Sequence, residues 1–299
     1  MNAAIPSRTM RHSRRHQYDD AIRDHVPNSR WTDRTDDPND PVAVAQRAAT
    51  LGAAWRDEIP DRVTFLEQRV RGRRVLDVGC VAHDKARMDA SNWLHARIAG
   101  SAAACLGVDI LDDGVAAMQR RGFDAIAHDL SCGLGPVADH GPFDVIVAGE
   151  LVEHVADLGM LFRTAADGLA PTGEMILTTP NPFSPRRVRA GQLGIAWENV
   201  DHIVYAFPSG IAELAERHGL VLAEAATTDT PVSRSTPRQW LARTVRGSHW
   251  RTVGLDTSGP VRQVPPDAGP VGRALRNLAR PKRRFVGETF VYVIRRAAE

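Results

Sequence analysis

Residues 75–84 read VLDVGCVAHD. The apolar residues that lead into Asp77 and Gly79 predict a buried strand followed by a tight turn. A turn that binds a pyrophosphate needs the pattern G-x-G-x-x-G, because the backbone must approach the ligand closely. The run from Gly79 to His83 contains one glycine. The stretch therefore predicts a site for a cofactor without phosphates and argues against a nicotinamide dinucleotide enzyme.

The rest of the chain alternates apolar strands with helical patterns. We expect an α/β fold in which a doubly wound, mostly parallel sheet of seven strands is covered on both faces. The expected strands are 73–79, 105–110, 123–130, 143–150, 174–180, 220–228 and 288–296. The expected helices are 42–71 with a break at Pro60, 92–104, 114–121, 151–169 and 208–217.

Composition divides the chain into four parts. Residues 1–40 hold seven Arg and seven Asp with almost no aliphatic residues, so we expect this segment to be disordered. A single core domain is expected over 41–228. The segment 229–287 holds twelve basic and three acidic residues and is expected to be a partly helical insertion. Residues 288–299 are expected to form the final edge strand of the core sheet.

Location and surface chemistry follow from the same sequence. No window approaches the roughly 18 apolar residues of a membrane span, and the N-terminus lacks the apolar centre of a signal peptide. Three scattered cysteines without a CxxC pair favour a reducing compartment. We therefore expect a cytoplasmic protein. The amphipathic basic stretch 271–280 suits peripheral contact with the anionic inner face of a membrane, or packing on its own domain.

Three acidic residues fall at three successive predicted strand ends: Asp77, Asp109 and Asp129. In a doubly wound sheet the ligand lies outside the carboxyl ends of the strands. Asp109 lies 30 residues after Gly79, where a carboxylate can accept hydrogen bonds from both hydroxyls of a ribose. The cofactor is therefore expected to contain a nucleoside.

VLDVGC, GVDI, HDL and FDVIVAGELVEH together resemble the motifs of the class I S-adenosylmethionine-dependent methyltransferases. The resemblance covers roughly residues 65–228 and the final strand, although the family usually has GCGxG where Val81 and His83 stand here. It implies cofactor contacts, with the methionine part near the first motif, the ribose on Asp109, adenine between Ile110 and Asp129, and the sulfonium beside the fourth motif. The implied residues are Asp77, Gly79, Cys80, Val81, Asp109, Ile110, Asp129, Leu130, Ala148, Gly149 and Glu150, with His83 and Asp84 beside the methionine carboxylate and amine.

The stretch 150–154, ELVEH, carries the candidate catalytic groups. If a helix begins there, Glu150, Glu153 and His154 project from one face of one turn, and His202 in the later DH pair reaches over the same strand ends. These four residues form an acceptable set for Mg²⁺, Mn²⁺, Fe²⁺ or Zn²⁺. Two other interpretations stay open: His154 acts as a metal-free base oriented by Glu153, or the residues are structural.

ELVEH followed by TTPNP and DH is similar to two groups, the 2′-O-methyltransferases of small RNA ends and the O-methyltransferases of ubiquinone biosynthesis. Both imply a divalent metal, Mg²⁺ or Mn²⁺ here, that lowers the pKa of the acceptor hydroxyl. We expect methylation of an oxygen on a small-molecule, sugar or envelope-precursor acceptor. RNA 2′-O-methylation and a degenerate cofactor-binding protein are the alternatives. Residues 178–189 (TTPNPFSPRRVR) are expected to form a loop in which Arg186, Arg187 and Arg189 face solvent or an anionic acceptor.

Overall fold

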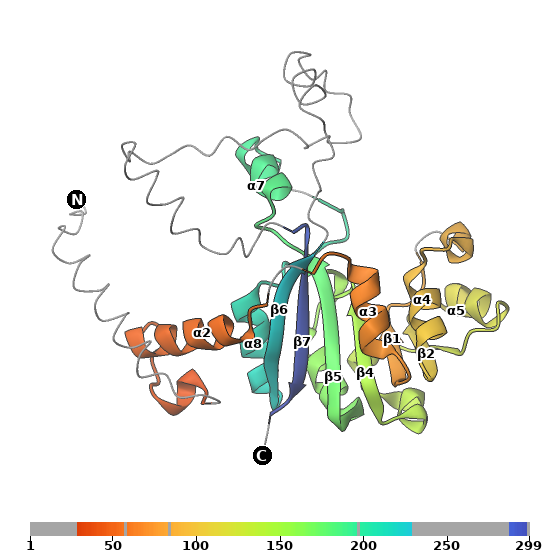
Figure 1. Ribbon diagram of the computed structural model, residues 1–299, viewed down its shortest axis with the longest axis horizontal. Coiled ribbons are helices and arrows are strands. Elements are labelled where there is room, and N and C mark those ends of the chain that lie inside the picture. Colours follow the sequence, from red (N-terminus) through yellow and green to blue (C-terminus); the bar gives the residue numbers. More distant parts are fainter. Residues whose placement is uncertain (1–28, 57–58, 83–84, 196–197, 229–286, 298–299) are drawn as a thin grey trace, which may run out of the picture.

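Seven strands form one sheet in the order β3-β2-β1-β4-β5-β7-β6 (Figure 1). The computed structural model describes residues 29–56, 59–82, 85–195, 198–228 and 287–297. The strands are β1 (Arg74–Val78), β2 (Ala104–Asp109), β3 (Ala125–Ala127), β4 (Phe143–Gly149), β5 (Leu169–Pro180), β6 (Leu220–Thr228) and β7 (Thr289–Arg296). The helices are η1 (Trp31–Asp33), α2 (Pro41–Ala54), α3 (Arg62–Val70), η2 (Lys85–Asp89), α4 (Leu94–Ser101), α5 (Asp112–Gln119), η3 (Leu130–Cys132), η4 (Gly135–His140), η5 (Val152–His154), α6 (Leu158–Gly168), α7 (Pro185–Gln192) and α8 (Pro208–Arg217).

The pairing of the strands confirms the doubly wound, mostly parallel sheet. β3, β2, β1, β4 and β5 are parallel to their neighbours, and β7 runs antiparallel to both β5 and β6. The strand order reverses between β1 and β4, which lie side by side although they are far apart in sequence. A ligand cleft is expected at the carboxyl ends of the strands beside this reversal.

The expectation that the last strand forms the sheet edge is wrong. β7 lies between β5 and β6, and β6 is the edge strand. All six residues from Thr289 to Ile294 are buried, which a strand in the interior of the sheet requires and an edge strand does not. Although β6 comes before β7 in the chain, β7 lies beside β5 and β6 lies outside it at the edge of the sheet.

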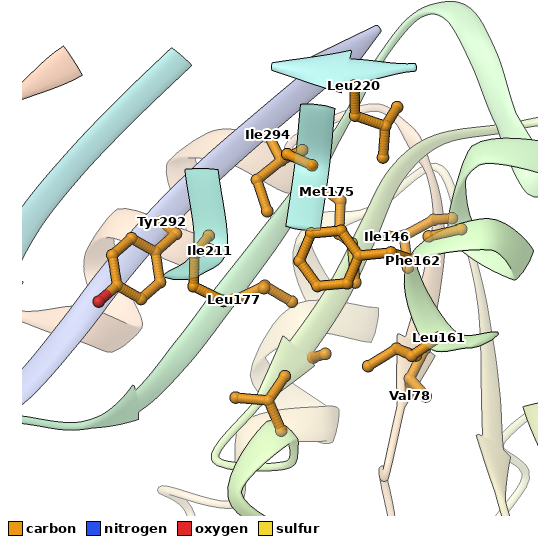
Figure 2. Packing of buried hydrophobic residues seen from close by; sticks show 14 of the residues in the cluster. Val78, Ile146, Leu161, Phe162, Met175, Leu177, Ile211, Leu220, Tyr292 and Ile294 are labelled. Carbon is orange, nitrogen blue, oxygen red and sulfur yellow. The ribbon is translucent and has the colours of Figure 1, made fainter. Parts of the chain in front are cut away.

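Helices cover both faces of the sheet. Ile146, Met175 and Leu177 point to the face covered by α6 and α8, and Phe162 of α6 belongs to the same apolar cluster (Figure 2). Leu76 of β1 is a further member of this cluster. On the other face, the alternate residues of the same strands pack against α3 and α4 in a second cluster: Val75, Val145, Val147, Ile176 and Val291 with Leu66, Val70 and Ile98. Because both faces of these strands are buried, their sequences are continuous apolar runs rather than alternating ones.

Residues 29–40 have a defined structure, so the expected disorder of residues 1–40 is wrong for this part of the segment. The indole Nε1 of Trp31 donates to Glu213 Oε2 on α8 at 2.9 Å. Asp40 caps α2 by accepting from the Val42 amide, and Arg47 on α2 pairs with Glu213 and Glu216. These contacts with α8 hold the segment in place. They could not be predicted from the composition of residues 1–40.

Residues 229–286, which include the expected basic amphipathic helix, lie outside the described residues. Among the residues that the structure does describe, no helix combines the length and the apolarity of a membrane span.

Candidate active site

The turn after β1 depends on Gly79. Its φ of +71° lies in the left-handed region, and its amide donates to the Val108 carbonyl at 2.8 Å. A Cβ at this position would lie 2.8 Å from Leu151 Cδ1, in the segment that follows β4. The turn therefore approaches the end of β4 closely, and it needs the one glycine that the sequence retains.

Val81, which replaces the usual second glycine, is accommodated by a glycine elsewhere. Gly114 lies in the first turn of α5, and a Cβ there would lie 2.3 Å from Val81 Cγ1. The valine side chain thus packs into space that Gly114 leaves empty. The altered motif is compatible with an intact turn because Gly114 in α5 has no side chain that would clash with Val81.

We expect Gly114→Ala to destabilise the folded protein by about 1–2 kcal/mol, because the clash with Val81 outweighs the gain of about 1 kcal/mol in helix propensity. In a Val81→Gly background the same substitution should be neutral or stabilising. Urea denaturation of the two single variants and the double variant measures this coupling. Equal effects of Gly114→Ala in both backgrounds would refute the compensation.

Asp109 lies at the end of β2 and organises the turn. Its two carboxylate oxygens accept hydrogen bonds from the amides of Val81 (2.9 Å) and Leu111 (3.1 Å). Burial raises the pKa of this carboxyl. A carboxylate has about four lone-pair positions, so two remain for ligand hydroxyls. The next side chain, Ile110, is 69% exposed, an apolar surface beside the carboxylate.

The other sequence-predicted cofactor residues divide into exposed and buried ones. Asp129 is exposed, caps η3 through the Ser131 amide at 2.8 Å, and stays at the same edge of the sheet. Leu130 and Cys80 are buried in apolar clusters, so only their backbone can face a ligand. Ala148 is fully buried in the sheet.

Asp77 is 3% exposed, and its Oδ2 lies 2.8 Å from Nδ1 of the buried His95. Its carboxylate therefore supports the turn from within the fold. The expected cofactor contact by this carboxylate remains a prediction. His83 and Asp84, expected beside the methionine part, lie outside the described residues.

Glu150 follows Gly149 at the end of β4 and has an unusual backbone. Its φ of 52° is the only positive value at a residue other than glycine in the described part of the chain. Such a conformation costs on the order of 1 kcal/mol and needs support from its surroundings. The Glu150 amide donates to the Thr178 carbonyl at 2.8 Å, and its carboxylate pairs with Arg62 at 3.0 Å. The backbone is thus turned so that the Glu150 side chain faces α3.

Arg62 is a site residue that the sequence did not reveal. It is the first residue of α3, held by the Asp61 cap, and its Nη1 lies 3.0 Å from Glu150 and 3.4 Å from Thr178 Oγ1. The chain before β1 therefore brings a cation to the ends of β4 and β5. A guanidinium here can pair with a ligand carboxylate such as that of a methionine group.

The expected helix over 151–169 begins later than predicted. Val152–His154 form the short 3₁₀ turn η5, and α6 starts at Leu158 after the Asp157 cap. Glu150 therefore does not share a helical face with Glu153 and His154, and the expected four-residue metal set is wrong in that geometry. Ligand atoms of Glu153, His154 and His202 lie within 4.8 Å of one another, and Glu150 is not in this group.

His202 reaches the group because its segment is tied to η5. The Ile203 amide donates to the Glu153 carbonyl at 2.9 Å, and the rings of His154 and His202 meet edge to face with centroids 4.7 Å apart. Burial and the neighbouring His154 ring lower the pKa of His202. The sequence correctly predicted that this histidine joins the ELVEH stretch.

Glu153 is the buried acid of the group, with 1% of its surface exposed. Its Oε2 accepts from Thr179 Oγ1 at 3.0 Å, and its Oε1 has no hydrogen-bond partner among the described residues. Burial, followed by the negative charge of Glu150, raises the pKa of the Glu153 carboxyl to about 7. A buried oxygen without a partner and a raised pKa both indicate a group that gains from a nearby cation.

Glu153 should also make the stability of the ligand-free protein depend on pH. The unfolded chain loses this proton near pH 4.5 and the folded protein near 7, so stability falls as pH rises through this interval, by on the order of 3 kcal/mol. We expect urea unfolding at pH 5 and pH 8, with a chelator present, to show a larger loss for the wild type than for Glu153→Gln. The same loss in both proteins would contradict the assignment.

The loop expected over residues 178–189 is wrong at both ends, since β5 runs to Pro180 and a helix begins at Pro185. Ser184 caps α7 (Pro185–Gln192), which stands above the edge at which β4 and β5 end (Figure 1). Arg187 pairs with Glu198 and with Glu288 at 3.1 Å, so it joins α7 to the following segment and to the chain before β7. Arg186 is exposed and Arg189 half-buried, and their expected contact with an anionic acceptor remains a prediction.

Comparisons with known proteins agree with this geometry. A family model described as a methyltransferase domain matches residues 49–225. The chain belongs to the methyltransferase-domain family. With its seven-stranded sheet it is a class I S-adenosylmethionine-dependent methyltransferase, as the motifs predicted.

Relatives of this methyltransferase include named enzymes. The "Ubiquinone biosynthesis O-methyltransferase" of Azorhizobium caulinodans is 31% identical over 198 residues, which are 57% of this chain and 72% of the relative. The protein of the same name from Idiomarina loihiensis is 27% identical over 188 residues, 57% of this chain and 71% of the relative. Among solved structures, a SAM-dependent methyltransferase from Archaeoglobus fulgidus has a TM-score of 0.47 at 14% identity and covers 78% of this chain and 94% of that one.

The residues of this methyltransferase fit S-adenosylmethionine. Asp109 retains lone pairs for ribose hydroxyls, and Ile110 offers an exposed apolar surface for adenine. The site would thus hold the nucleoside between the ends of β1 and β2, with Glu150 and Arg62 toward the methionine part.

Proposed function

We propose that this methyltransferase methylates a hydroxyl oxygen of a small acceptor, with a divalent cation held by Glu153, His154 and His202. The observation that carries the proposal is the meeting of these three side chains within 4.8 Å, directly after the end of β4. Glu150 borders the expected cofactor site, and Glu153 and His154 follow it within four residues of the chain. His202 joins them through the hydrogen bond from the Ile203 amide to the Glu153 carbonyl.

The chemistry explains why such a group is useful. S-adenosylmethionine supplies an activated methyl group, and the acceptor oxygen must approach it in line and without its proton. A divalent cation at the three side chains would lower the pKa of an acceptor hydroxyl and fix its position. His154 and His202 offer imidazole nitrogens and Glu153 a carboxylate, a donor set that suits Mn²⁺, Fe²⁺ or Zn²⁺ better than Mg²⁺, which prefers oxygen ligands.

Metal-free base catalysis by His154 uses the same residues and makes a different prediction. In that case turnover would persist when divalent cations are removed, and Glu153 would serve only to orient the ring. The buried Glu153 oxygen without a partner favours the cation, because a base dyad leaves this oxygen unsatisfied.

The surface beside the group favours an acceptor with an apolar part. Ile203, which follows His202 and is tied to Glu153, is exposed, as are several other large apolar side chains of the same region: Phe183, Val188, Leu193, Val200, Tyr205 and Phe207. The names of the relatives supply an example of the chemistry, O-methylation in ubiquinone biosynthesis. We therefore propose a hydroxylated aromatic acceptor with an aliphatic substituent.

The test uses S-adenosylmethionine labelled with ¹³C in the methyl group, with Mg²⁺ or Mn²⁺ present. Four acceptors are compared: an alkyl catechol, the matched alkyl aniline, a nucleotide sugar and a short RNA with a 3′-terminal diol. The expected result is a ¹³C methoxy signal on the catechol. Label on the aniline nitrogen would overturn O-methylation, and label on the sugar or the RNA alone would overturn the proposed acceptor class.

A further inference from the structure

Asp201 contacts the imidazole of His154. Its Oδ2 lies 3.1 Å from Nδ1 of His154. The side chain of His154 is largely buried, whereas that of Asp201 is half exposed. Asp201 belongs to the DH pair of the sequence, but only His202 of that pair was predicted to have a role.

The backbone around Asp201 is fixed on both sides. The His202 amide donates to the Asn199 carbonyl at 3.3 Å, and the Ile203 amide donates to the Glu153 carbonyl at 2.9 Å. Consecutive side chains therefore reach the two sides of one ring: Asp201 meets His154 Nδ1, and the His202 ring packs against the His154 ring at a centroid distance of 4.7 Å.

A carboxylate accepts hydrogen bonds and cannot donate them when ionised, so the nitrogen that faces it must carry the proton. In a neutral imidazole the other nitrogen then has the free lone pair. We infer that Asp201 is a positioning residue that holds His154 as its Nδ1–H tautomer and thereby leaves the free lone pair on Nε2. The inference about the tautomer stands on the ligand-free geometry, and its use in methyl transfer rests on the proposed function.

The direct test is the ¹⁵N spectrum of the full chain labelled at histidine, in chelator-treated buffer, with His154 assigned by its loss in His154→Gln. The wild type should show a protonated Nδ1 and a pyridine-type Nε2. Asp201→Ala should shift His154 toward the Nε2–H form, while Asp201→Asn, whose amide oxygen can still accept, should largely keep the wild-type tautomer. The exposed Asp139→Ala is the matched control and should change nothing.

A second arm connects the tautomer to the cation. Loss of a carboxylate that orients a ligating histidine typically weakens metal binding 10–100-fold, so Asp201→Ala should weaken Mn²⁺ binding by that factor. A wild-type His154 that is protonated at Nε2, or an unchanged tautomer in Asp201→Ala, would overturn the inference. If Asp201→Ala shows the expected tautomer shift but the wild type does not bind Mn²⁺, the proposed function is overturned and the inference about the tautomer stands.

Discussion

Asp109→Ala is expected to weaken the binding of S-adenosylhomocysteine by about 100-fold or more. Two hydrogen bonds from ribose hydroxyls to an ionised carboxylate are lost, each contributing about 1.5–3 kcal/mol. The substitution also removes the acceptor for the Val81 and Leu111 amides, so the turn itself loosens. Calorimetric titration of the cofactor product into each protein measures the effect.

Two further variants separate ligand contacts from general damage. Asp109→Asn keeps the shape and one acceptor oxygen, so an intermediate loss of affinity is expected. Asp139→Asn changes an exposed carboxylate beyond the site and should bind as the wild type does. Affinity of Asp109→Ala within a few-fold of the wild type, with its fold intact by circular dichroism, would show that the ribose lies elsewhere.

His202→Ala is expected to reduce turnover by about 100- to 10,000-fold while cofactor affinity changes little, because His202 belongs to the acceptor side of the site. Mn²⁺ affinity should fall in parallel, since one of three protein ligands is removed. Initial rates at saturating cofactor, with Mn²⁺ binding followed by electron paramagnetic resonance, test both expectations. His140→Ala, an exposed histidine outside the site, is the control.

An equal loss of S-adenosylhomocysteine binding in His202→Ala would mean that this residue supports the fold of the cofactor site. Reduced turnover with unchanged Mn²⁺ affinity would favour metal-free catalysis. Only a joint loss of turnover and Mn²⁺ binding supports the proposed assignment.

The strands, and the position of Asp109 and Asp129 at strand ends, could be predicted because both depend on local sequence. Continuous apolar runs identify buried strands; Asp109 is the last residue of β2, and Asp129 lies two residues after the end of β3. The position of β7 could not be predicted, because strand pairing depends on partners about 110 residues away, on β5. The geometry of Glu150 was missed because a left-handed conformation at a glutamate is set by its contacts with Arg62 and Thr178, which come from distant segments.

The residues that support the catalytic group carried no signal of their own. Thr179 and Asp201 lie in the quoted stretches TTPNP and DH, but their roles follow only from contact with Glu153 and His154. The compensation of Val81 by Gly114 is similar, since a glycine early in a helix usually has no such meaning. In each case a tertiary contact, rather than the local pattern, decides the role.

The most direct test of the central claim is the initial rate of methyl transfer to an alkyl catechol as Mn²⁺ is added to chelator-treated enzyme. We expect a low basal rate that rises to saturation with Mn²⁺ in the wild type, and a rate that stays low at all Mn²⁺ concentrations in Glu153→Gln. Full activity of the wild type in the presence of chelator would contradict the claim that Glu153, His154 and His202 act by holding a divalent cation.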